Sequence, residues 1–146
     1  MDSRSQLETL INLARRASDD AAKRLGAAIK AAGDAEKKLD MLVGYRNDYA
    51  KGFEAAMAIG MTPMAYRNFQ AFLGKLDNAI AGQQEVLRQA QRRSDLEKTA
   101  WQASERKRMS YTTLDNRAQQ EAVRVEAKRD QKLMDEHAAR QAFYKR

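Results

Sequence analysis

The stretch Ile59-Gly60-Met61-Thr62-Pro63 decides the fold of this chain. Glycine is the residue that most often ends a helix in a left-handed cap, so Gly60 predicts the end of one helix. Thr62 can cap the start of the next helix, and Pro63 can occupy its first turn without losing a hydrogen bond. Pro63 is the only proline in 146 residues. We therefore predict two long helices, at about residues 3–58 and 63–142, joined by a turn at residues 59–62.

The residues before this turn repeat in the pattern of a coiled coil. Apolar or small residues recur at alternating steps of four and three, and only Ser18 and Arg46 interrupt them. Sustained over most of a helix, this period is typical of a coiled-coil seam. The predicted seam is Leu7, Ile11, Ala14, Ser18, Ala21, Leu25, Ala28, Ala32, Ala35, Leu39, Leu42, Arg46, Tyr49, Phe53 and Ala56.

The residues after the turn continue the same stepping less regularly. It runs clearly from Phe69 to Ala90, weakens over the polar stretch 94–108, and recovers in part at Ala118, Ala122 and Val125. The pattern leaves open whether the second helix is continuous through that polar stretch. Its early positions are Phe69, Leu73, Leu76, Ile80, Gln83, Leu87 and Ala90, and its later ones Ser94, Glu97, Trp101, Ser104, Arg108, Tyr111 and Asp115.

We expect an all-α fold, a long antiparallel two-helix coiled coil that forms one domain over residues 1–146. The turn places residue i opposite roughly residue 121 − i. At 1.5 Å per residue the second helix is about 120 Å long and the first about 84 Å, so the second helix should overhang the first beyond about Ala118. A helix without a tertiary partner is only marginally stable in water, so this overhang should dock onto another protein or pair with a second copy.

One side of the hairpin near the turn is unusually aromatic. Tyr45, Phe72 and Ala79 each precede a seam position by one residue, and such positions on antiparallel helices fall on the same flank. Together with the neighbouring seam residues Leu42, Tyr49 and Leu76 they form a patch that two helices cannot cover. Exposed aromatic patches often mark partner sites, although ordinary packing beside the seam would also place aromatic residues here.

Four glycines, Gly26, Gly33, Gly44 and Gly52, interrupt the first helix. Each costs about 1 kcal/mol relative to alanine in a helix. Close helix packing and built-in flexibility both explain them.

Composition and charge limit the classes of function that this protein can have. Cysteine is absent, no signal peptide begins the chain, and no apolar run is long enough to span a membrane, so we expect a soluble cytoplasmic protein. Of the net charge of +7, residues 88–146 supply +6, with 15 basic and 9 acidic side chains. This excess suggests an acidic partner, although a charged, solvated helix face is the more common reason for it.

Motifs for catalysis or cofactor binding are missing from the sequence. Gly74-Lys75-Leu76 lacks the other residues of a phosphate loop. His137 is the only histidine, and its neighbours Asp135 and Glu136 point to other faces of a helix, so a metal site is not expected. We therefore expect no cofactor and no enzymatic activity.

Four short motifs, in their order and spacing, resemble the flagellar FliJ family over nearly the whole chain. This family is a soluble component of the bacterial flagellar type III export apparatus. The one departure is His137, where the family often has an aromatic residue. The motifs are Leu39-x-x-Leu42-x-x-Tyr45-Arg46-x-x-Tyr49, Gly60-Met61-Thr62, Phe69-x-x-Phe72-Leu73-x-x-Leu76-x-x-Ala79-Ile80, and Gln131-Lys132-x-x-Asp135-Glu136-x-Ala138.

The resemblance implies an antiparallel coiled coil, similar in shape to the central stalk of rotary ATPases. It implies that the chain ends insert into the hexameric export ATPase and promote its activity. It also implies contact with export chaperones and with the cytoplasmic domain of the large export-gate membrane protein, at the cytoplasmic face of the inner membrane. Carried over by motif, the gate-binding residues are Leu42, Tyr45, Tyr49, Phe72, Leu76 and Ala79.

The candidate residues for ATPase binding lie on the overhanging helix: Arg124, Lys128, Arg129, Gln131, Lys132 and Asp135. Two other functions remain possible. The chain could be the equivalent stalk of a virulence-type secretion system, or a basic coiled coil that binds nucleic acid or anionic membrane. We expect no specific nucleic acid partner, because the basic residues lack interleaved aromatics or a reading helix.

Overall fold

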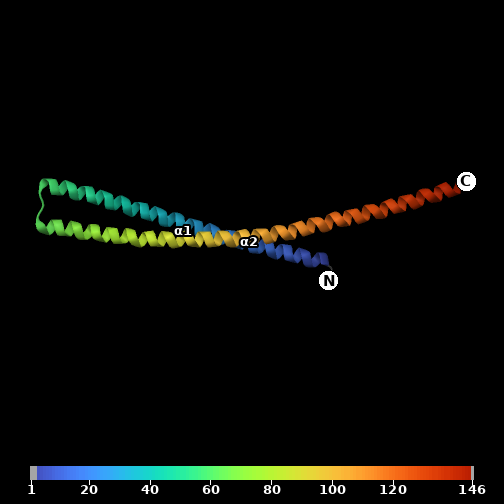
Figure 1. Ribbon diagram of the computed structural model, residues 1–146, viewed down its shortest axis with the longest axis horizontal. Coiled ribbons are helices and arrows are strands. Elements are labelled where there is room, and N and C mark those ends of the chain that lie inside the picture. Colours follow the sequence, from blue (N-terminus) through green and yellow to red (C-terminus); the bar gives the residue numbers. More distant parts are fainter. Residues whose placement is uncertain (1–2, 146) are drawn as a thin grey trace. The chain divides into compact units, whose positions relative to one another are not determined.

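The computed structural model describes residues 3–145, which form two helices and no strand. Helix α1 spans Ser3–Ile59 and helix α2 spans Pro63–Tyr144 (Figure 1). The predicted all-α helical hairpin is therefore confirmed. Helix α2 is continuous through the polar stretch 94–108, the point that the sequence left open. Neither helix holds, within residues 3–145, an apolar stretch long enough to cross a membrane.

The turn is built as its residues predict. Gly60 has a φ of 110°, a left-handed conformation that costs glycine little, and its N–H donates to the carbonyls of Ala56 and Met57 at 3.2 Å. The Thr62 Oγ1 accepts a hydrogen bond from the N–H of Ala65 at 3.2 Å and so caps α2. The two caps end one helix and begin the next within three residues.

The hairpin divides into two compact units. One unit contains Met1–Ser18 and Ala103–Arg146, and the other contains Asp19–Gln102. Each unit pairs a segment of α1 with a segment of α2. A single domain over the whole chain stays a prediction.

The predicted seam is the face along which the helices pack. All its positions in α1, from Leu7 to Ala56, are buried or half-buried, as are those in α2 from Phe69 to Asp115. The contacts also follow the expected register. Tyr49 packs on Phe72, Arg24 pairs with Glu97, and every interhelical pair named below lies within three residues of the rule that joins i to 121 − i.

The seam changes in character along the chain. Near the turn, the rings of Tyr49, Phe53, Tyr66, Phe69 and Phe72 contact one another with centroids 4.5–5.5 Å apart. Farther from the turn, the buried apolar residues are alanines at seven-residue intervals: Ala14, Ala21, Ala28 and Ala35. A buried methyl group contributes only about 0.8 kcal/mol, so the aromatic segment supplies more apolar burial per residue than the alanine segment.

Polar residues in the seam are satisfied across the two helices. Arg46, which interrupts the apolar pattern of α1, donates from Nε to Asp77 Oδ1 at 3.0 Å. Gln83 donates to the backbone carbonyl of Ala35 at 3.1 Å. Glu97 pairs with Arg24 at 3.5 Å and with Arg93 at 3.0 Å. The contacts of Arg46 with Asp77, Gln83 with Ala35 and Arg24 with Glu97 join the two helices, so they favour this register over its neighbours.

Ser18, the other interruption in α1, belongs to a three-residue network with Glu105 and Arg108. The Ser18 hydroxyl donates to Glu105, and Arg108 donates two hydrogen bonds to the same carboxylate at 3.0 and 2.9 Å. The Arg108 hydrogen bonds and that of Ser18 lower the pKa of Glu105 from its usual 4.5 to about 2. The network therefore depends on an ionised carboxylate.

The glycines of α1 are not required for close packing. A Cβ atom added at Gly26, Gly33, Gly44 or Gly52 would meet no atom within 4 Å. Their φ angles are helical, in contrast to that of Gly60. Of the two explanations that the sequence leaves open, close helix packing is excluded at these positions.

We predict that Gly26→Ala combined with Gly44→Ala stabilises the protein. Alanine fits both sites and restricts the unfolded chain, so the pair should add about 1–2 kcal/mol to the free energy of unfolding. Thermal unfolding followed by circular dichroism measures the effect as a higher Tm. Gly60→Ala is the control and should lower the Tm, because alanine is strained at a φ of 110°. A lower Tm for the double variant would mean that these glycines have a packing role.

We predict that Glu105→Gln lowers the Tm at pH 7. A carboxylate whose folded pKa lies below its unfolded pKa stabilises the fold above the unfolded value, near 4.5, and loses this contribution as the pH falls toward about 2. The difference in Tm between the variant and the parent protein should therefore shrink over that range. Glu36→Gln, at an exposed site that forms no ion pair within the described range 3–145, is the control. A Tm difference independent of pH would contradict the proposed role of the charge.

Candidate functional site

The structure places the six predicted gate-binding residues on one side of the turn-proximal part of the hairpin. We call Leu42, Tyr45, Tyr49, Phe72, Leu76 and Ala79 the aromatic face. Leu42, Tyr49 and Leu76 are half-buried in the seam, whereas Tyr45, Phe72 and Ala79 are exposed beside it. Tyr45 is 59% exposed and Phe72 44%, so much of their apolar surface contacts water.

Four residues of the aromatic face share one hollow. Tyr45, Tyr49, Phe72 and Leu76 line a depression of about 420 Å³, together with Asp48. Leu42 and Ala79 lie one helical turn beyond it and do not line it. Asp48 was not among the predicted residues. It precedes the seam residue Tyr49 by one position, so the rule that selected Tyr45 and Phe72 could also have selected Asp48.

Tyr49 makes the ring contacts that support the hollow. Its ring centroid lies 4.5 Å from that of Phe72 and 5.1 Å from that of Phe69, in tilted arrangements. Aromatic pairs at this spacing contribute about 0.5–1.5 kcal/mol beyond the area that they bury. Tyr45 makes no ring contact of this kind within residues 3–145. Tyr49 therefore stabilises the fold, while Tyr45 is available for contact with another molecule.

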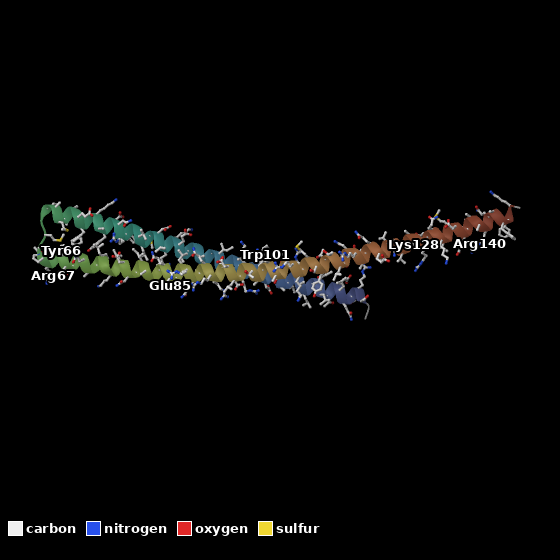
Figure 2. All side chains as sticks on the ribbon, in the orientation of Figure 1. Tyr66, Arg67, Glu85, Trp101, Lys128 and Arg140 are labelled. Carbon is white, nitrogen blue, oxygen red and sulfur yellow. The ribbon has the colours of Figure 1, made fainter. Side chains whose placement is uncertain are left out.

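The second candidate surface is the overhanging part of α2, residues 116–145, which we call the arm. Every residue of the arm is exposed (Figure 2, where Lys128 and Arg140 mark it). The exposed residues include large apolar ones: Val123, Val125, Leu133, Met134, Phe143 and Tyr144. The overhang predicted beyond about Ala118 is thus confirmed.

Five of the six predicted ATPase-binding residues share one face of the arm. Arg124, Lys128, Gln131, Lys132 and Asp135 recur at helical spacing, within about 100° around the axis. Arg129 lies apart from them. It lines a hollow of about 620 Å³ on the uncovered continuation of the seam, with Ala118, Ala122 and Val125 among its neighbours.

The arm is stabilised by pairs within its own helix. Arg124 binds Glu121 through two hydrogen bonds of 2.6 and 3.0 Å, and Gln131 donates to Asp135 at 3.1 Å. The hydrogen-bonded Arg124 guanidinium lowers the pKa of the Glu121 carboxyl, and Glu121 raises that of Arg124. Both side chains of the Arg124–Glu121 pair are exposed, so such pairs support the helix of the arm without fixing it to another element.

An apolar hollow lies at the base of the arm. The start of α1 contributes Leu7 and Leu10, and α2 contributes Leu114, Ala118 and Ala122, to a depression of about 570 Å³. Leu10 and Leu114 each precede a seam position, like Tyr45 and Phe72. This end of the hairpin therefore also carries exposed apolar surface beside the seam.

We predict that Tyr45→Ala combined with Phe72→Ala leaves the helix content unchanged and costs about 1 kcal/mol of stability, mainly from the lost ring contact of Phe72 with Tyr49, because Tyr45 is 59% exposed. Tyr49→Ala should cost about 2 kcal/mol, because it removes contacts with two rings. Circular dichroism spectra and urea unfolding measure both quantities. Lost helix content in the double variant would mean that Tyr45 and Phe72 are mainly structural.

Comparison with known proteins agrees with these features. The family model described as "Flagellar FliJ protein" matches residues 3–146. Two relatives with that same name resemble the chain, one from Escherichia coli (strain K12) at 33% identity and one from Salmonella typhi at 34%. Each alignment extends over 139 residues and covers 95% of this chain and 95% of the relative. The chain, a two-helix hairpin with an aromatic face and an exposed arm, therefore belongs to the flagellar FliJ family.

Proposed function

We propose that this member of the flagellar FliJ family acts as a stalk-like adaptor of the flagellar type III export apparatus, without enzymatic activity of its own. It would insert into the hexameric export ATPase, promote ATP hydrolysis, and connect the ATPase to the export gate. The single observation that carries this proposal is the match to the family over almost the entire chain. Export chaperones are further partners in this proposal.

The arm is the segment that we assign to the ATPase. A helix whose every residue from 116 to 145 is exposed gains stability when another protein encloses it. Arg124, Lys128 and Lys132 give one face of this helix three positive charges, and its acids are Asp135 and Glu121, the partner of Arg124. An acidic pore lining would complement this face and would steer its entry.

The aromatic face is the surface that we assign to the cytoplasmic domain of the large export-gate membrane protein. Tyr and Phe are enriched at the centres of protein interfaces, because they bury a large area at little cost in conformational entropy. The aromatic face and the arm use different residues, so the protein could engage both partners at the same time.

We predict that Lys128→Glu combined with Lys132→Glu abolishes the stimulation of the cognate flagellar export ATPase, because the substitutions reverse the charge of the arm. Removal of residues 124–146 should do the same and leave the hairpin folded, since residues 124–145 are all exposed. The rate of ATP hydrolysis, with and without the protein at low and moderate salt, measures the effect. Stimulation by the parent protein should saturate well below one copy per ATPase subunit.

A matched control is Lys23→Glu combined with Lys30→Glu. These lysines are also exposed but lie on α1, so this variant should stimulate the ATPase as the parent protein does. Undiminished stimulation by the truncated protein would contradict the role of the arm. Absence of any stimulation, with nucleic acid co-purifying instead, would favour a basic coiled coil that binds nucleic acid.

A further inference from the structure

The hollow of the aromatic face contains one charged group. Asp48 lines it beside Tyr45, Tyr49, Phe72 and Leu76. Among residues 3–145 the Asp48 carboxylate forms no hydrogen bond and no ion pair. It does not pair with Lys51 either, although Lys51 lies one turn further along α1. Asp48 is exposed, so this carboxylate is accessible to solvent in the free protein.

A partner that covers the hollow must also cover this carboxylate. Removing water from the rings of Tyr45 and Phe72 is favourable, because their exposed surface is apolar. Removing water from an unpaired carboxylate is costly, and the cost disappears only if the partner supplies a cation and hydrogen-bond donors. The hollow therefore selects for a partner with both an apolar group and a positive charge.

We propose that the hollow binds a protein segment that inserts an apolar side chain between Tyr45 and Phe72 and places a lysine or arginine against Asp48. The inference rests on the proposed function, because it takes the segment to belong to the cytoplasmic domain of the export-gate protein. Asp48 is then a specificity residue, which rejects segments that lack the cation. The carboxylate would also repel phosphate groups, so this surface does not suit nucleic acid or anionic lipid.

The test measures binding of the full-length protein to the purified cytoplasmic domain of its cognate export-gate protein. At low salt Asp48→Asn should weaken the affinity about tenfold, and Asp48→Lys about a hundredfold, as expected for the loss and reversal of a charge-assisted hydrogen bond. The effect of Asp48→Asn should diminish at moderate salt, because salt screens the charges. Asp40→Asn is the matched control. Asp40 is exposed on the same helix, follows a seam position and does not line the hollow, so its substitution should leave the affinity unchanged.

Tyr45→Ala and Phe72→Ala, measured in the same assay, separate this inference from the proposed function. Lost binding by these two variants, with unchanged or tighter binding by Asp48→Asn, would overturn the inference and leave the gate as the partner. Unchanged binding by all three variants would overturn both. Weaker binding by Tyr45→Ala, Phe72→Ala and Asp48→Asn, with Asp40→Asn unaffected, would support both. Circular dichroism establishes that each variant is folded.

Discussion

The register that the turn imposes on the two helices determines the rest of the structure. Gly60, in a left-handed conformation, and Thr62, as a cap, reverse the chain within three residues and leave little freedom in the alignment of α1 with α2. A shift of one residue in either helix would rotate its seam by about 100° and replace apolar contacts with charged side chains. The ring contacts near the turn and the polar contacts along the seam all depend on this alignment.

The two kinds of seam have different roles. The aromatic segment combines strong packing with exposed ring surface, so the contacts that stabilise it also present Tyr45 and Phe72 at a defined position. The alanine segment buries little area. Polar residues such as Gln83 and Glu97 fix the alignment of the two helices there more than they add stability. Beyond Asp115 the seam continues without a covering helix, which leaves the arm exposed. One repeating pattern thus yields a segment of packed rings, a segment of small buried residues and an unpaired helix.

Much of this structure could be predicted from the sequence, because the coiled-coil period sets burial directly. The seam from Leu7 to Ala56, the contact between Tyr49 and Phe72, and the exposed overhang followed from spacing alone. The network of Ser18, Glu105 and Arg108 did not, because a polar residue in a seam does not reveal how far a long side chain on the other helix can reach. Asp48 was missed for a different reason. Partner surfaces are predicted from exposed apolar residues, and a carboxylate does not meet that criterion even though its position places it on the same flank.

The antiparallel alignment also governs the order in which the helices can pair during folding. Phe53 and Tyr66 are close in sequence, whereas Ser18 and Glu105 are separated by 87 residues. The entropic cost of closing a loop rises with its length. In this hairpin the contacts that close the longest loops are polar ones such as that of Ser18 with Glu105, and they stabilise the fold less than the aromatic contacts near the turn. We therefore expect the two helices to pair first beside the turn and then progressively toward the chain ends. Each contact shortens the loop that the next contact must close. In a partly open molecule, the start of α1 would separate first, while the aromatic face remained assembled.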